Sequence, residues 1–202
     1  MSKLLASAVA AAALMSTAAP AAAQEVIAGV FAHDVTFIGE AVGLGAAGKE
    51  DGVDVQIGWR SEPIEAFSLG DPRFFAQLTL NSEGLSDFGA VGLVWRKHFG
   101  DDKRWYVAPG IGLAYTDGWD EFPSFSEPGL SPAELNRRIA LRSERIEFGS
   151  KVLFQPELSI GRYVGENAAI ELSYVHLSHG QILGSGKNEG MDDVGVRLIW
   201  RY

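Results

Sequence analysis

The sequence contains no cysteine, so it has neither a disulfide framework nor a thiolate nucleophile. It is also short of positive charge, with 17 Lys and Arg against 26 Asp and Glu and a formal net charge of −9. An acidic chain is repelled by phosphate groups, which argues against nucleic acid as a partner. After residue 23 no long apolar run occurs, and this argues against a helical membrane protein.

The first 23 residues have the composition of a secretory signal rather than of a folded domain. Lys3 is their only charge, an apolar stretch follows it, and Ala21-Ala22-Ala23 provides the small residues that a signal peptidase needs. We therefore expect residues 1–23 to be a signal peptide, cleaved before Gln24, and residues 24–202 to form one domain. Loss of Lys3 would change the formal charge from −9 to −10. A retained N-terminal anchor is the alternative.

The rest of the chain reads as eight segments in which apolar residues alternate with polar or small ones. Such a period of two is typical of β-strands with one apolar face. Abundant glycine, 24 residues in all, fits many turns and closely approaching strands. The expected strands lie near residues 25–38, 52–60, 73–82, 87–99, 104–117, 148–163, 167–178 and 192–202.

A soluble sandwich would show similar alternation, but three features favour a barrel in a membrane. The segments are about ten residues long, which suits a tilted strand that crosses a bilayer. Their number is even, as closure without free edges requires. If the chain starts in the periplasm, the bulky aromatics on the apolar parity fall at one height, as in an aromatic girdle: Trp59, Trp95, Trp105, Trp200 and Tyr202. The predicted fold class is all-β, an eight-stranded antiparallel transmembrane β-barrel.

Two of the outer connections are long, near 39–51 and 118–147. Ser131 followed by Pro132 is a good helix start, so a short helix is predicted there, through Ala140. Proline removes a hydrogen bond from a β-ladder. Pro109 and Pro156 lie inside two neighbouring strands, and a bulge or local gap is therefore expected beside them.

Three residues with catalytic potential converge on the last hairpin. His176 and Ser178 are two apart and share the apolar, outward parity. Asp192 opens the next strand with the same parity and can come level with His176. An imidazole can take the proton of a serine hydroxyl, and a carboxylate can orient the imidazole. Interfacial polar residues would show the same spacing, so the pattern alone leaves both interpretations open.

Other ionisable residues form no such pattern. His33 and His98 lie on or near other strands without metal-ligand spacing, and we interpret them as ordinary barrel residues. Glu189 is a rival for the catalytic acid, but its place in a loop favours a solvated surface position. No metal and no cofactor is expected.

The segment His176-Leu177-Ser178-His179, followed by Asn188-Glu189-Gly190-Met191-Asp192, resembles the C-terminal signature of the PagL-type lipid A 3-O-deacylases. In that family His-x-Ser-Asn precedes a short loop and Asn-x-Gly-x-Glu or a similar acid. The resemblance implies an outer-membrane acyloxyacyl hydrolase with a lipid-facing triad that removes the acyl chain at position 3 of lipid A without a metal. It assigns His176 as the base, Ser178 as the nucleophile and Asp192 as the orienting acid.

The chain departs from this signature at three points. His179 replaces the asparagine that can help to hold the oxyanion, and backbone N–H groups near His179 and Gly180, or the histidine ring, could substitute for it. Asp192 is shorter than glutamate, and the loop from Gly180 to Lys187 looks about two residues longer. The expected substrate is lipid A or lipopolysaccharide, met by a site that faces the outer leaflet of the bacterial outer membrane. A homodimer is left open.

Two other functions remain in competition with this one. The first is a non-enzymatic barrel, an adhesin or a structural protein with long surface loops. The second is an outer-membrane enzyme that acts on a different lipid ester, such as a phospholipase or an acyltransferase.

Overall fold

The computed structural model describes residues 24–36, 48–65, 67, 69–184 and 186–202. The expected signal peptide, residues 1–23, lies outside the described residues, as does most of the predicted outer loop 39–51. Among the described residues no helix has the length and apolar character needed to cross a membrane.

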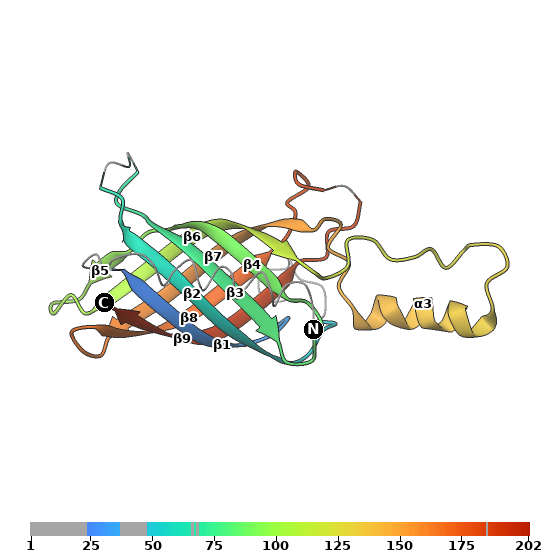
Figure 1. Cartoon of the computed structure of the whole chain (residues 1–202), viewed down its shortest axis with the longest axis horizontal. Coiled ribbons are helices and arrows are strands. Elements are labelled where there is room, and N and C mark those ends of the chain that lie inside the picture. The colour runs from blue at the N-terminus through green and yellow to red at the C-terminus, as the bar shows by residue number, and fades with distance from the viewer. Residues whose placement is uncertain (1–23, 37–47, 66, 68, 185) are drawn as a thin grey trace.

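The strands form one antiparallel sheet that closes on itself (Figure 1). Strands that follow one another along the chain pair, except β4 and β5. β1 pairs with β9, and β4 pairs with β6 to complete the ring. The strands are β1 (Glu25–Ala32), β2 (Val53–Pro63), β3 (Arg73–Asn81), β4 (Phe88–Val94), β5 (Lys97–Phe99), β6 (Trp105–Thr116), β7 (Val152–Tyr163), β8 (Ala168–Leu177) and β9 (Met191–Arg201).

The nine strand segments make an eight-stranded barrel because β4 and β5 are two parts of one predicted strand. β4 pairs with β6 as far as Gly110, and β5 resumes the pairing at Val107 in the same register. Pro109 lies between these two partners and has no N–H to donate. The gap expected beside Pro109 therefore falls in the neighbouring strand, and the predicted segment 87–99 is divided there.

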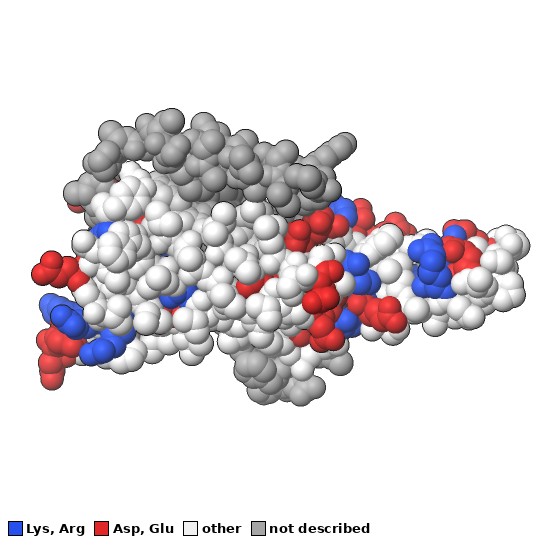
Figure 2. Space-filling model, turned by 60° about the horizontal axis from the view of Figure 1, so that its bottom comes forward, with Lys and Arg blue, Asp and Glu red and all other residues white. Residues whose placement is uncertain are grey.

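The outer wall of the barrel is apolar over its middle. Its large side chains are about half exposed, as expected for a surface that meets lipid, for example Val30 at 56% and Leu158 at 55%. Figure 2 shows that charged residues gather at the two ends and on the projecting helix, with few on the wall between them. Near the end where β1 begins, Val26 pairs with both Trp59 and Trp200, so these indoles lie level on the wall. The aromatic girdle is confirmed at these positions.

The barrel interior is packed with paired polar side chains instead of a channel. Arg60 donates to both oxygens of Glu171 at 2.7 and 3.0 Å, and Arg197 donates to Glu157 at 3.0 Å. All four side chains are almost fully buried. Buried charges need such partners, and a barrel of eight strands leaves little room for water.

The two ends of the barrel differ. At one end, which we call the terminal end, β1 begins, β9 finishes, and two of the three connections, residues 100–104 and 164–167, are short. At the other end, the helix end, the long connection between β6 and β7 carries α3 (Pro132–Glu144) well beyond the barrel (Figure 1). Ser131 caps the helix by accepting from the Glu134 N–H, as predicted. The helix runs a turn past Ala140, because no glycine or proline stops it and Glu134 pairs with the arginines one turn later.

Candidate active site

The candidate site occupies the outer wall where β7, β8 and β9 approach the helix end. The strand registers place three outward-facing residues in each of three rows. From the middle of the wall toward the helix end, the rows are Leu158–Tyr174–Val194, then Pro156–His176–Asp192, then Phe154–Ser178–Gly190. The sequence-predicted residues His176, Ser178 and Asp192 therefore share one face and two adjacent rows.

His176 and Asp192 form the closest contact in this group. They are direct cross-strand partners, and the His176 Nδ1–H donates to Oδ1 of Asp192 at 2.5 Å. Ser178 exchanges both backbone hydrogen bonds with Phe154 of β7. His176 lies two residues earlier, so its N–H and C=O also point toward β7 and away from β9. His176 and Asp192 are then a non-hydrogen-bonded pair, the kind whose side chains lie closer together. The strand register therefore brings Asp192 close enough to contact His176, although aspartate is shorter than glutamate.

A proline gap borders this pair on its other side. The regular ladder between β7 and β8 stops at Glu157 and Val175, and only the isolated bridge between Phe154 and Ser178 follows. Pro156 lies in this interval, level with His176, and it cannot donate to the neighbouring strand. The gap expected beside Pro156 is thus found next to the candidate catalytic histidine.

Ser178 and His176 lie on neighbouring rows without a hydrogen bond between their side chains in the described part of the chain. The His176 ring leans toward the row of Ser178 and Gly190, because a Cβ built on Gly190 would lie 2.8 Å from Cε1 and 3.5 Å from Nε2 of the ring. Nε2 has no hydrogen-bond partner among the described residues. Since Nδ1 carries the proton given to Asp192, the neutral ring presents an unshared electron pair at Nε2. Catalytic hydrogen bonds often tighten only when substrate is bound.

His179 occupies a different environment from these residues. Its side chain is buried, its Nδ1 accepts from the Gln181 N–H at 3.1 Å, and its Nε2–H donates to the Lys187 carbonyl at 3.0 Å. Its backbone N–H donates to Oδ1 of Asn188. These contacts brace the loop after β8 and leave no donor of His179 free. The Gly180 N–H, by contrast, has no partner among the described residues.

Glu189 is an anchor between loops and not the solvated side chain that we expected. Its Oε1 pairs with Lys49 and with Lys187, each at 2.6 Å, and its Oε2 accepts from the Glu147 N–H at 2.9 Å. Three of the four connections at the helix end are joined through this carboxylate. A loop position could not reveal these partners, because they lie 42 and 140 residues away along the chain.

A second histidine–carboxylate group lies inside the barrel at the same end. His33 Nδ1 is 2.9 Å from Oδ2 of Asp54 and 3.7 Å from Oδ1 of Asp193. The Nε2 of the same ring is 3.2 Å from Oε2 of Glu50. All of these side chains are buried. His33 is therefore the centre of a buried ion network inside the barrel. The sequence alternation shows that His33 faces inward, but it does not show which carboxylates lie at the same height in the barrel.

The His33 network could also supply metal ligands, since atoms of His33, Asp54 and Asp193 all lie within 4.8 Å of one another. However, both ring nitrogens of His33 face carboxylates, and carboxylates only accept, so the arrangement fits a doubly protonated imidazolium. Burial alone would lower the pKa of His33, but the hydrogen bonds to Asp54 and Glu50 outweigh it and raise the pKa to about 10. For Glu50, burial would raise the pKa, but His33 and Arg145 lower it to about 2.

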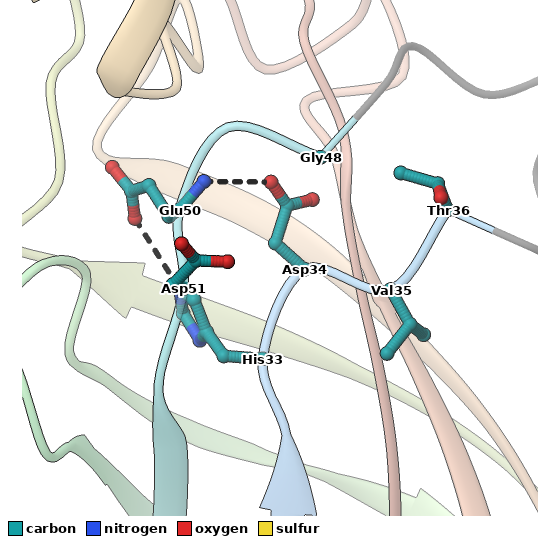
Figure 3. Close-up of a pocket in the computed structure, with 7 residues that line it drawn as sticks. All are labelled: His33, Asp34, Val35, Thr36, Gly48, Glu50 and Asp51. Atoms are coloured by element: carbon teal, nitrogen blue, oxygen red, sulfur yellow. Dashed lines mark hydrogen bonds and ion pairs between the residues drawn. The ribbon is translucent and has the colours of Figure 1, made fainter.

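An open pocket adjoins this network, and Figure 3 shows its lining. Carboxylates dominate that lining, with Glu50 and Asp34 joined through the Glu50 N–H. Such a pocket suits neither a phosphorylated lipid nor an acyl chain, because like charges repel and the walls are polar. The interior network therefore fits a structural role, whereas His176 on the outer wall keeps a ring nitrogen without a partner among the described residues.

Comparison with known proteins identifies the family and the fold of this chain. The family model of PagL, described as lipid A 3-O-deacylase, matches residues 51–201. No curated protein sequence matches the chain. Among solved structures, that of the outer membrane enzyme PagL is similar with a TM-score of 0.56 and 15% identity, covering 87% of this chain and 98% of that one. A de novo designed transmembrane β-barrel gives 0.48 and 10%, covering 92% and 98%. Neisserial surface protein A gives 0.46 and 12%, covering 89% and 96%. Because the family model spans most of the sequence, the chain belongs to the PagL family of lipid A 3-O-deacylases, integral proteins of the outer membrane.

Proposed function

We propose that this protein removes the 3-O-linked acyl chain of lipid A by a serine mechanism on the lipid-facing wall of the barrel. The observation that carries the proposal is the 2.5 Å contact between His176 and Asp192, one row from Ser178 on an outer wall. Polar side chains on such a wall lose hydration, so they are expected only where they have a use. Family membership identifies the ester.

In the proposed reaction Nε2 of His176 accepts the Ser178 hydroxyl proton while Oγ attacks the ester carbonyl carbon. Asp192 holds the ring in the required tautomer and stabilises the imidazolium. The imidazolium then gives its proton to the departing sugar oxygen, and an acyl-serine remains. Water, deprotonated by His176, attacks this ester and releases the fatty acid together with free Ser178.

The oxyanion formed in both steps needs a hydrogen-bond donor. The free N–H of Gly180 is the better candidate of the two that we predicted, because every donor of His179 already has a partner. Gly180 has a positive φ of 59°, a conformation that glycine adopts without strain and that directs its N–H differently from a continuing strand.

The helix end is assigned to the cell exterior, so that the site faces the outer leaflet where lipid A resides. The short connections and the indole row at the terminal end support this orientation, since outer-membrane barrels have short periplasmic turns. A cysteine introduced at Ser126, in the loop that carries α3, should react with an impermeant reagent on intact cells. Labelling only after permeabilisation would reverse the orientation.

Residues 1–23 as a signal peptide and a homodimer as the assembly also remain proposals. N-terminal sequencing of protein purified from outer membranes should begin at Gln24, and a retained Met1 would refute cleavage. Cross-linking of the protein in native membranes checks the dimer, with a purely monomeric pattern as the opposing result.

The test of the function is mass spectrometry of lipid A from cells that express the wild type, Ser178→Ala or no protein. We expect loss of the 3-linked chain only with the wild type. Ser173→Ala is the matched control, since Ser173 lies on the same strand but inside the barrel, where it bonds to Ser159 at 2.8 Å. If Ser178→Ala deacylates as the wild type does, the serine mechanism is wrong. Release of a different acyl chain would favour another lipid esterase, and unchanged lipid would favour a non-enzymatic barrel.

A further inference from the structure

Tyr174 lies on the outward face of β8, one row closer to the middle of the wall than His176. Its hydroxyl donates to Oδ1 of Asp192 at 2.8 Å. The same oxygen accepts from His176 Nδ1 at 2.5 Å. Two donors from one strand therefore converge on a single oxygen of the candidate catalytic acid, although the direct cross-strand partner of Tyr174 is Val194.

The surroundings of Tyr174 make this contact stand out from the rest of the wall. Apolar neighbours on the same face point into the lipid region, with Leu158 at 55% exposed and Leu172 at 54%. Tyr174 is only partly exposed, because its ring extends along the wall toward Asp192. A hydroxyl at a lipid-facing surface cannot rely on water and needs a protein partner, and a carboxylate there has the same need.

Asp192 has few other means of support on this wall. A carboxylate that orients a catalytic histidine must stay ionised and must keep one oxygen on the ring nitrogen. Groups behind such a side chain commonly fix its orientation and its charge. In the described part of the chain, Tyr174 and His176 are the only groups that donate to the Asp192 carboxylate.

We propose that Tyr174 is a positioning residue of the reaction, which holds the Asp192 carboxylate turned toward His176. The inference rests on the proposed function for its role in turnover, but the contact itself is independent of it. Tyr174 acts through Asp192 and needs no contact with the substrate. Its loss should therefore lower kcat and leave KM nearly unchanged.

The matched control is Tyr115→Phe. Tyr115 also faces outward, on β6 near the helix end, it is 54% exposed, and its hydroxyl has no hydrogen-bond partner among the described residues. Both substitutions remove one phenolic hydroxyl from the lipid-facing wall, so they match in chemistry and in their effect on membrane insertion. Only Tyr174→Phe removes a donor from Asp192.

The kinetic test is a double-mutant cycle on purified, refolded protein in lipid A micelles. We expect Tyr174→Phe to lower kcat about 10- to 100-fold, in line with the loss of one hydrogen bond to a charged group. In the Asp192→Ala background the same substitution should have no further effect, because interacting residues are not additive. A penalty of equal size in both backgrounds, or wild-type kcat in Tyr174→Phe, would overturn the positioning role.

A second measurement separates this inference from the proposed function. The Nδ1 proton of His176, assigned by its absence in His176→Asn, should give a low-field NMR resonance. Tyr174→Phe should shift that resonance and Tyr115→Phe should not. If the wild type releases no acyl chain but the shift is seen, the proposed function fails while Tyr174 still organises the pair. If the wild type is active and neither kcat nor the resonance responds to Tyr174→Phe, the inference fails alone.

Discussion

Two histidine–carboxylate groups lie back to back at the helix end of this barrel, on either side of one strand. Asp192 faces outward to His176, and the next residue, Asp193, faces inward to His33. The inner ring has carboxylates at both nitrogens and is buried, so it is held as an imidazolium. The outer ring has a carboxylate at Nδ1 only and is partly exposed. The number of partners separates the roles, because a histidine with both nitrogens occupied cannot accept a proton, whereas one with a free Nε2 can.

The largest expected effect is that of a substitution in the outer histidine–carboxylate group. His176→Asn removes the base, so deacylation should fall by about 10³-fold or more, as in other serine hydrolases that lose their base. The free energy of unfolding should change little, because the side chain is partly exposed. Lipid A deacylation rates and urea unfolding of the refolded barrel in vesicles measure the two quantities. Retained activity would remove His176 from the mechanism.

The matching substitution inside the barrel, His33→Asn, should give the opposite result. It leaves Asp54, Asp193 and Glu50 without their shared cation, and breaking a buried ion network typically lowers stability by about 3–5 kcal/mol. Deacylation should decline far less than in His176→Asn. Equal losses of activity in the two variants would show that the inner network takes part in catalysis and is not only structural.

Gly190→Ala sharpens the geometry of the outer group. A Cβ at this position would approach Cε1 of His176 to 2.8 Å, so the ring must turn away from the row that holds Ser178. Misplacement of a catalytic group by about 1 Å lowers the rate about 10- to 100-fold. Gly165→Ala is the control, since nothing lies within 4 Å of its added Cβ. Equal kcat values for the two variants would mean that the added Cβ at position 190 does not displace the His176 ring from its catalytic position.

The inner group predicts a pH window for the stability of the helix end. The pKa of His33 is raised from 6.5 to about 10, so its contribution is complete below pH 6.5 and is lost as the pH rises toward 10. The pKa of Glu50 is lowered from 4.5 to about 2, so its contribution is complete above pH 4.5 and is lost as the pH falls toward 2. Stability from this network should be greatest between pH 4.5 and 6.5. The difference between wild type and His33→Asn in urea unfolding should shrink as the pH rises from 6.5 to about 10, and a constant difference would contradict the assignment.

The sequence predicted the barrel well because its signals are local. Period-two alternation determines which face meets lipid, and Pro109 and Pro156 located two irregularities of the ladder. The register shift between β2 and β3, at Arg60 and Pro63, was not predicted. The outer site was accessible for the same reason, since His176, Ser178 and Asp192 belong to one hairpin and share parity.

The inner network was not accessible in this way. Glu50 and Asp54 reach His33 from one part of the chain and Asp193 from another, and their heights depend on strand register. Parity gives the face of a side chain but not its level. Tyr174 was missed for a different reason: its parity matched that of an ordinary wall residue, and only the direction of its side chain reveals the contact with Asp192.

The smallest effect is expected for Glu189→Gln, which tests whether the loop anchor belongs to either group. Glutamine keeps an oxygen that can accept from the Glu147 N–H but loses the charge that pairs with Lys49 and Lys187. Lys187 is half exposed, so its pair is screened by solvent, and the total loss of stability should stay near 1 kcal/mol and diminish in high salt. Deacylation should be unchanged, because Asp192 and not Glu189 contacts His176. A large loss of kcat in Glu189→Gln, with normal unfolding, would mean that the loops at the helix end carry part of the catalytic machinery and that the outer wall alone does not make the site.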